Sequence, residues 1–75
     1  MSSTIDTARD ILATLAPEIP ADKITEEANL VEDLRLDPVT KFALAVQLER
    51  ALKISIPDSR IEQAATIPDL VNDEN

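Results

Sequence analysis

Five prolines determine where helices can run in this chain of 75 residues. Proline lacks a backbone N–H and clashes with the preceding turn, so it is excluded from helix interiors but favoured at a helix start. Pro17 and Pro20 therefore end a first helix, and Pro38 begins a second. Pro57 precedes a third helix, and Pro68 is tolerated in the first turn of a fourth. These proline positions predict a small all-α fold.

The first helix is expected over residues 4–15. Its apolar residues fall on one stripe at about 100° per residue, and they are Ile5, Ala8, Ile11, Leu12 and Leu15. Ser3 or Thr4 can cap its start, and Asp6 lies where the helix dipole favours an anion.

The second helix should run from Pro38 to about Leu52, because Asp37 is a good N-cap and proline suits the first helical position. Ser59-Arg60-Ile61-Glu62 has the pattern of a capping box and predicts a short third helix. Thr66 can cap a last helix with Ile67, Leu70 and Val71 on one face. Residues 72–75 are expected to fray.

Residues 16–36 form a connection that is long for a compact domain, and such connections often carry function. Its apolar residues lack helical spacing, which predicts a loop pinned onto the helices with one short turn from Thr25. These residues are Ile19, Ile24, Leu30, Leu34 and Leu36. No repeat or boundary divides the chain, so residues 1–75 are expected to form a single domain.

Glycine, cysteine and histidine are among the residue types that the chain lacks. Their absence excludes a P-loop, a dinucleotide fingerprint, a thiol nucleophile, a histidine-based triad and the usual zinc site. The net charge of −8 argues against nucleic acid and anionic membranes as partners. The N-terminus lacks a signal-peptide pattern, and Phe42 to Val46 is the longest apolar run. A cytoplasmic protein is therefore expected.

The acidic pairs Glu26-Glu27 and Glu32-Asp33 are the clustered titratable groups of the sequence. Paired carboxylates perform acid–base catalysis only when burial separates their pKa values. In a polar loop they are interpreted as solvated surface, with adventitious Ca²⁺ binding as a weaker alternative. We therefore expect no enzyme, assign no catalytic residue and predict no metal site.

The predicted second helix has two apolar faces. One is a core stripe of Leu44, Ala45, Leu48, Ala51 and Leu52. The opposite side carries Val39, Phe42, Ala43 and Val46, followed by Glu49, Arg50 and Lys53. A second apolar face is covered by another element, offered to a partner, or divided between the two. Residues 37–53 carry three bases against two acids, a net charge of +1 within an otherwise acidic chain.

Several short motifs have the order and spacing of an acyl carrier protein: Leu30-Val31-Glu32-Asp33-Leu34, Asp37, Ile56-Pro57-Asp58 and Thr66-Ile67. The resemblance runs from about Ile5 to Val71 and implies a four-helix bundle with a long first loop and a short third helix. In that family an Asp-Ser-Leu motif opens the second helix, and its serine hydroxyl carries a 4′-phosphopantetheine arm. This chain has Asp37-Pro38-Val39 there. Proline has no hydroxyl, so we expect no cofactor.

Other departures from the family lie close to Pro38. A glycine usual before the motif is Arg35 here. The family's second helix presents carboxylates to basic patches on partner enzymes, but only Asp37 and Glu49 keep that sign. Thr40, Ala43 and Arg50 do not. Loss of rim charges mostly slows association, so the usual modifying enzyme should bind poorly.

The leading hypothesis is a monomeric, carrier-like module without an arm. It would dock to a protein partner, namely an enzyme of acyl or polyketide synthesis or its regulator. The expected contact residues are Asp37, Pro38, Val39, Lys41, Phe42, Val46, Glu49, Arg50 and Lys53. Two alternatives stay open. One is a true carrier with its serine engineered away or its arm attached elsewhere, and the other is a bundle that holds an acyl chain non-covalently between the second and third helices.

Overall fold

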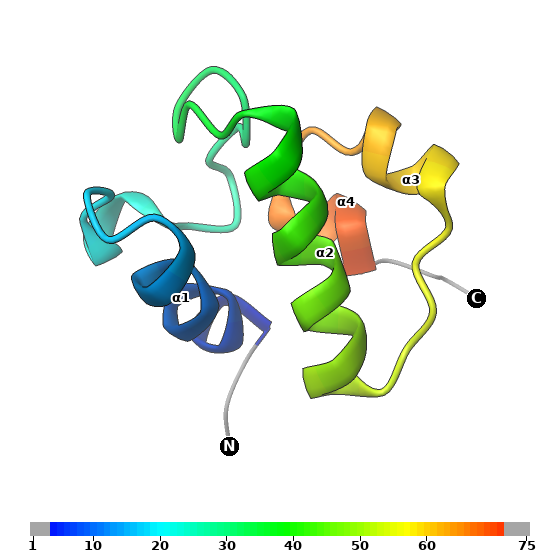
Figure 1. Ribbon diagram of the computed structural model, residues 1–75. Coiled ribbons are helices and arrows are strands. Elements are labelled where there is room, and N and C mark those ends of the chain that lie inside the picture. Colours follow the sequence, from blue (N-terminus) through cyan, green and yellow to red (C-terminus); the bar gives the residue numbers. More distant parts are fainter. Residues whose placement is uncertain (1–3, 72–75) are drawn as a thin grey trace.

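The computed structural model describes residues 4–71, in which four α-helices surround one apolar core. They are α1 (Thr4–Leu15), α2 (Pro38–Leu52), α3 (Asp58–Gln63) and α4 (Ile67–Val71), with a 3₁₀ turn, η1 (Ala21–Lys23), in the first connection. In Figure 1, α2 crosses the centre of the molecule, with α1 on one side and α3 on the other. The described range contains no strand. The predicted all-α four-helix fold with a short third helix is confirmed.

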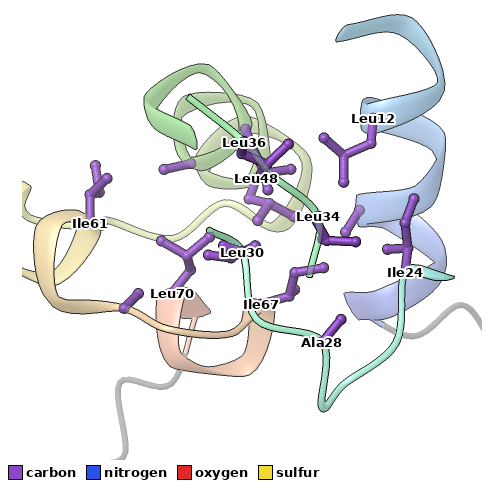
Figure 2. Close-up of a cluster of buried hydrophobic side chains, with 14 of the residues drawn as sticks. Leu12, Ile24, Ala28, Leu30, Leu34, Leu36, Leu48, Ile61, Ile67 and Leu70 are labelled. Carbon is purple, nitrogen blue, oxygen red and sulfur yellow. The ribbon is translucent and has the colours of Figure 1, made fainter. Parts of the chain in front are cut away.

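The long first loop supplies a large part of the core. Figure 2 shows its apolar side chains pointing inward between α1, α2 and α4. Ile24, Leu30, Leu34 and Leu36 from this loop are all buried, beside Leu12, Leu44, Leu48, Ile67 and Leu70 from the helices. Ile19 is packed against this core and is partly buried. The prediction of a loop pinned onto the bundle is therefore confirmed.

Backbone hydrogen bonds hold the loop in place. The amide of Leu30 donates to the carbonyl of Ala65 across 2.7 Å, which joins the loop to the α3–α4 connection. The side-chain oxygen of Asn29 accepts from the amides of Val31 and Glu32 at 2.9 and 2.8 Å. The turn expected from Thr25 is present, since its carbonyl accepts from the Ala28 amide at 3.3 Å. The 3₁₀ turn η1 has no counterpart in our sequence predictions.

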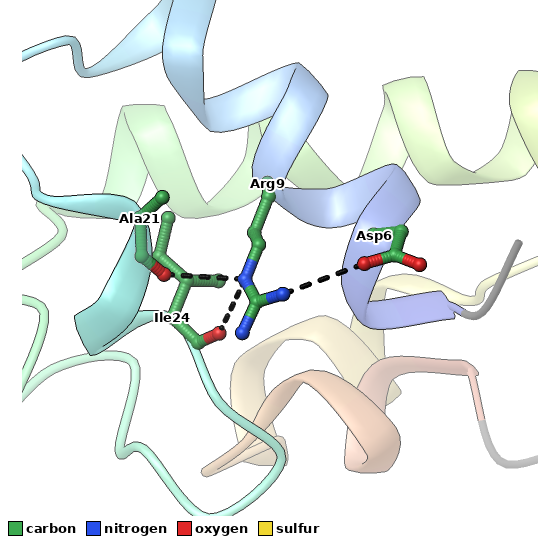
Figure 3. A network of polar contacts seen from close by, with 4 residues as sticks. All are labelled: Asp6, Arg9, Ala21 and Ile24. Carbon is green, nitrogen blue, oxygen red and sulfur yellow. Dashed lines mark hydrogen bonds and ion pairs between the residues drawn. The ribbon is translucent and has the colours of Figure 1, made fainter.

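Arg9 fastens the same loop to α1, as Figure 3 shows. Its Nε donates to the carbonyls of Ala21 and Ile24 at 3.1 and 3.0 Å, while Nη1 pairs with the Asp6 carboxylate at 3.4 Å. The sequence pattern placed Arg9 only on the polar side of the first helix. In the structure, its side chain donates to the carbonyl of Ala21, the first residue of η1, and to that of Ile24, its C-cap.

The structure confirms the predicted start and range of α2 and corrects two other sequence predictions. The N-cap role of Asp37 and the range of α2 are as predicted, but Ala51 is exposed rather than part of the core stripe. The capping box predicted from Ser59 is wrong, because α3 begins at Asp58 with Pro57 as N-cap and no side-chain cap. Ser3 and the predicted fraying of residues 72–75 lie outside the described residues.

The cap of α4 is confirmed and is more complete than the sequence suggested. The Thr66 hydroxyl accepts from the Asp69 amide at 3.3 Å. In return, the Asp69 carboxylate accepts from the amides of Ala65 and Thr66 at 3.1 and 3.3 Å. Reciprocal capping of this kind satisfies amides that a helix start leaves without partners, so a helix of only five residues has a defined beginning.

Candidate functional site

The start of α2 is fixed by Asp37. Its Oδ1 accepts a hydrogen bond from the Thr40 amide at 2.7 Å, and its carbonyl accepts from the Lys41 amide at 2.9 Å. The hydrogen bond from the Thr40 amide lowers the pKa of the Asp37 carboxyl from its ordinary value of 3.8. Pro38 is the first helical residue. It costs no hydrogen bond there, because an amide at that position has no partner within the helix.

Pro38 is exposed, and its side chain is a hydrocarbon ring. A phosphodiester needs a hydroxyl oxygen, which proline does not have. Ser55 and Ser59 are exposed but follow the C-terminal end of α2, so neither stands at its start. The residues at the start of α2 therefore do not fit a serine-linked phosphopantetheine group.

The second apolar face of α2 is partly covered and partly open. Val39 and Phe42 are 78 % and 47 % exposed, whereas Ala43 and Val46 are half-buried. This face is thus divided between covered and exposed residues, which is one of the outcomes that the sequence analysis left open. The term "outer face of α2" is used below for Val39, Phe42, Val46, Arg50 and Lys53.

A groove of about 610 Å³ adjoins this face between the first loop, the N-terminal half of α2 and α3. Its apolar walls come from Val31, Leu36, Pro38, Val39, Phe42 and Ile61. Val31, at the loop end of the groove, is 52 % exposed. The polar side chains in the lining are Lys41 and Glu62. Apolar walls with a few polar groups are typical of small-molecule sites.

Lys41 was expected to be a contact residue for a partner, but only 9 % of its surface is exposed. Its side chain lies along the groove, and Nζ is 3.4 Å from the carbonyl oxygen of Glu62 in α3. Helical spacing places Lys41 on the core stripe of α2, because the buried residues Leu44, Ala45 and Leu48 follow it at i+3, i+4 and i+7. Its burial therefore agrees with the helical period, and the sequence analysis missed it by treating a lysine as a surface residue.

Glu49 also has a structural role that the sequence did not indicate. Its side chain is half-buried, and Oε2 accepts from the Ile56 amide at 2.7 Å. Arg50 and Lys53 are exposed at the C-terminal end of α2. With Glu49 engaged by the backbone and Lys41 buried, the outer face of α2 combines apolar side chains with two exposed bases at one end.

Arg35 adopts a left-handed backbone conformation, with φ of 58°. A side chain with a Cβ is strained there, whereas glycine is not. This is the position at which the family resemblance implies a glycine. The structure gives that departure a physical meaning, because the turn that leads into Asp37 and Pro38 retains a shape suited to glycine.

The acidic pairs of the first loop are exposed, as expected for solvated surface. Asp33 accepts a hydrogen bond from the Asn29 amide at 2.8 Å, which serves the loop itself. Residues 4–71 contain no group of three or more side chains placed to hold a metal ion. None of the helices in that range is long and apolar enough to cross a membrane.

Comparison with known proteins places these features in a family. Residues 6–73 match the family described as "Phosphopantetheine attachment site". An acyl carrier protein from Campylobacter jejuni subsp. doylei is 35 % identical over 65 residues, which cover 84 % of each chain. One from Thermobifida fusca is 32 % identical over 66 residues, with the same coverage. One from Syntrophobacter fumaroxidans is 37 % identical over 62 residues, covering 80 % of this chain and 76 % of that protein.

Proposed function

This chain belongs to the acyl carrier protein family, the non-catalytic carriers of fatty-acid and polyketide biosynthesis, and we propose that it is a carrier-like docking module without a phosphopantetheine arm. The observation that carries the proposal is the proline at position 38, the first residue of α2. Proteins of this family dock to synthase enzymes. The proposed partner is therefore an enzyme of acyl or polyketide synthesis, or a regulator of one.

At position 38, proline prevents attachment of the arm but does not disturb the start of α2. Attachment of the arm requires a hydroxyl oxygen to form the phosphodiester, and the proline ring supplies only carbon. The fold does not need the hydroxyl, because Asp37 caps α2 and proline is well suited to the first helical position. A chain with these residues keeps the carrier scaffold and loses the attachment reaction.

The outer face of α2 is the proposed contact surface. Phe42 provides an aromatic side chain at its centre, and aromatic residues contribute most of the binding energy in many interfaces. Arg50 and Lys53 provide a rim that favours an acidic surface on the partner, since rim charges mainly steer association. Asp37 and Glu49 are engaged by backbone amides, so we assign them to supporting this surface rather than to direct recognition.

A capture experiment from the native source tests the docking surface. Tagged wild-type protein should retain partners that the Phe42→Asp variant loses, because an exposed carboxylate would replace the apolar centre of the face. Ala13→Asp is the matched control, since Ala13 is exposed on α1, away from the outer face of α2. Loss of the same partners from both variants, or from neither, would argue against docking through α2.

The variant Pro38→Ser separates this proposal from a carrier whose serine was replaced. We expect a phosphopantetheinyl transferase to modify Pro38→Ser poorly, because the neutral Thr40 and Ala43 and the basic Arg50 stand where the resemblance implies acids. Modification of Pro38→Ser as fast as that of a true carrier would show that the surface still serves that enzyme. A replaced serine would then be the better explanation.

A further inference from the structure

We propose that the outer face of α2 binds an amphipathic α-helix of the partner, antiparallel to α2, with acidic side chains in the first turns of that helix. This inference rests on the proposed docking function and names the element of the partner that meets α2. Its charge is opposite to what the resemblance implies, since carriers of the family present carboxylates to basic patches. Here Arg50 and Lys53 present bases to an acidic patch.

The spacing of residues on this face suits a second helix. A line of side chains runs along α2 at alternating steps of four and three residues, through Val39, Ala43, Val46 and Arg50, and Lys53 follows at the C-cap. Residues with this spacing form the seam along which two α-helices pack side by side, each inserting side chains between those of the other. The outer face therefore has the residue pattern of a helix–helix contact.

The exposure of these residues leaves the seam available. Val39 is 78 % exposed near the start of α2, and Phe42 beside the seam is 47 % exposed. Ala43 and Val46 are half-buried in the middle of the helix. The apolar part of the seam thus lies in the N-terminal half of α2 and its basic part at the C-terminal end, so a fitting helix is apolar along one side and acidic at one end.

Arg50 and Lys53 need acids from outside the described part of the chain. Within residues 4–71, neither forms a salt bridge. The neighbouring acid, Glu49, instead accepts from the Ile56 amide at 2.7 Å. The chain as a whole has a net charge of −8 and repels a uniformly acidic surface. The acids of the partner are therefore confined to the part that meets these two bases.

The direction of the partner helix follows from the helix dipoles. Acidic side chains are stabilised in the first turn of a helix and disfavoured in the last. Arg50 lies in the last turn of α2, and Lys53 is its C-cap. When the partner helix runs antiparallel to α2, acids opposite these bases lie in its first turns. In the parallel direction, the same acids would lie in its last turns.

Titrations with three synthetic helical peptides, followed by amide NMR chemical shifts, test the proposal. All three peptides have the same leucine seam. The first has glutamates in its two N-terminal turns, the second has lysines there, and the third has glutamates in its two C-terminal turns. At low salt, wild-type protein should bind the first peptide about ten-fold more tightly than the second, and more tightly than the third. The shifts should centre on Phe42, Val46 and Arg50.

Charge exchange on the protein provides the matched comparison. The double variant Arg50→Glu/Lys53→Glu should reverse the preference, so that the lysine peptide binds more tightly than the first peptide. Lys53→Glu alone should reduce the wild-type preference. Lys23→Glu changes the net charge equally but should leave the preference unchanged, because Lys23 is exposed in η1, which Arg9 joins to α1. If the double variant does not fold, the two single variants still decide.

Several results would overturn the proposal. They are failure of the first peptide to bind wild type, equal binding of the first peptide and either other one, and a preference that survives the double substitution. Concentration-dependent shifts of the outer face without peptide would assign it to a second copy of the chain instead. If Phe42→Asp loses captured partners but the peptides show no charge preference, docking through α2 stands and the acidic helix is wrong.

Discussion

The carboxylate of Asp37 accepts a hydrogen bond from the backbone amide of Thr40 across 2.7 Å. The two residues lie on either side of Pro38, which is the first residue of α2. The start of the helix is therefore held by its neighbours and does not depend on the chemistry of residue 38. A carrier fold can lose its attachment residue at this place without losing the helix.

The cap makes part of the stability depend on pH. The hydrogen bond lowers the pKa of Asp37 in the folded protein below its ordinary value of 3.8. The stabilising contribution is therefore present above that value and is lost as the pH falls below it through the folded-state pKa. Asparagine also caps helices but does not ionise in this range. We predict that Asp37→Asn loses less stability than wild type between neutral pH and pH values below 3.8.

Denaturant unfolding of both proteins at a series of pH values measures this difference. The rest of the chain titrates in the same way in both, so the difference between the two curves isolates Asp37. If the free energies of unfolding of the two proteins change in parallel down to the lowest pH measured, the charge of Asp37 does not contribute to the cap.

Arg35 provides a test of backbone strain. With φ of 58°, it occupies a conformation that costs a residue with a Cβ roughly 1–2 kcal/mol. Glycine relieves that cost but loses more conformational freedom on folding. We predict that Arg35→Gly raises the free energy of unfolding by about 0.5–1 kcal/mol.

The same substitution within a helix should change the free energy of unfolding in the opposite direction. Arg50 is exposed within α2, where glycine costs about 1 kcal/mol relative to a good helix former. Arg50→Gly should therefore lower the free energy of unfolding by that amount. If both Arg→Gly variants shift stability in the same direction, the left-handed conformation of Arg35 is not the reason.

The first loop should behave as part of the core. Leu30 is fully buried and Val31, the next residue, is 52 % exposed. We predict that Leu30→Ala lowers the free energy of unfolding by roughly 2–5 kcal/mol, while Val31→Ala changes it by less than about 0.5 kcal/mol. Thermal and denaturant unfolding of the two variants would measure this. Similar small effects for both would indicate a loop that is not packed as described.

Glu49 is predicted to matter for the fold. Its Oε2 accepts from the Ile56 amide at 2.7 Å, in the connection that leads to α3. Glu49→Ala leaves that amide without its acceptor and should cost about 1 kcal/mol of unfolding free energy. Glu49→Gln retains an acceptor oxygen and should cost less. Equal losses in the two variants would show that the hydrogen bond is not responsible.

The helices and the buried loop residues were predictable because their signals are local. The helix predicted from apolar spacing over residues 4–15 has the same bounds as α1 (Thr4–Leu15). The Asp37-Pro38 pair correctly predicted where α2 begins. The burial of Leu30 and Leu36 followed from apolar residues in an otherwise polar loop. Such features need only the residue types and their order along the chain.

The site was less predictable because its properties arise between elements. Glu49 meets the amide of a residue seven positions later, so a helical wheel of α2 does not show its role. Lys41 lies on the core stripe of that wheel, and its burial was missed because lysine is usually a surface residue. Arg9 likewise gains its role only when η1 lies against α1. The left-handed Arg35 could be expected from the family's glycine, but not from arginine itself.

The most direct measurement is the intact mass of the wild-type chain after co-expression with a broad-specificity phosphopantetheinyl transferase. A true acyl carrier protein in the same cells serves as the positive control for the transferase. We predict that this chain has the mass of the unmodified polypeptide while the control carries the arm. A wild-type mass increased by one phosphopantetheine group, with the adduct located by peptide sequencing, would contradict the central claim that Pro38 leaves this carrier fold without an arm.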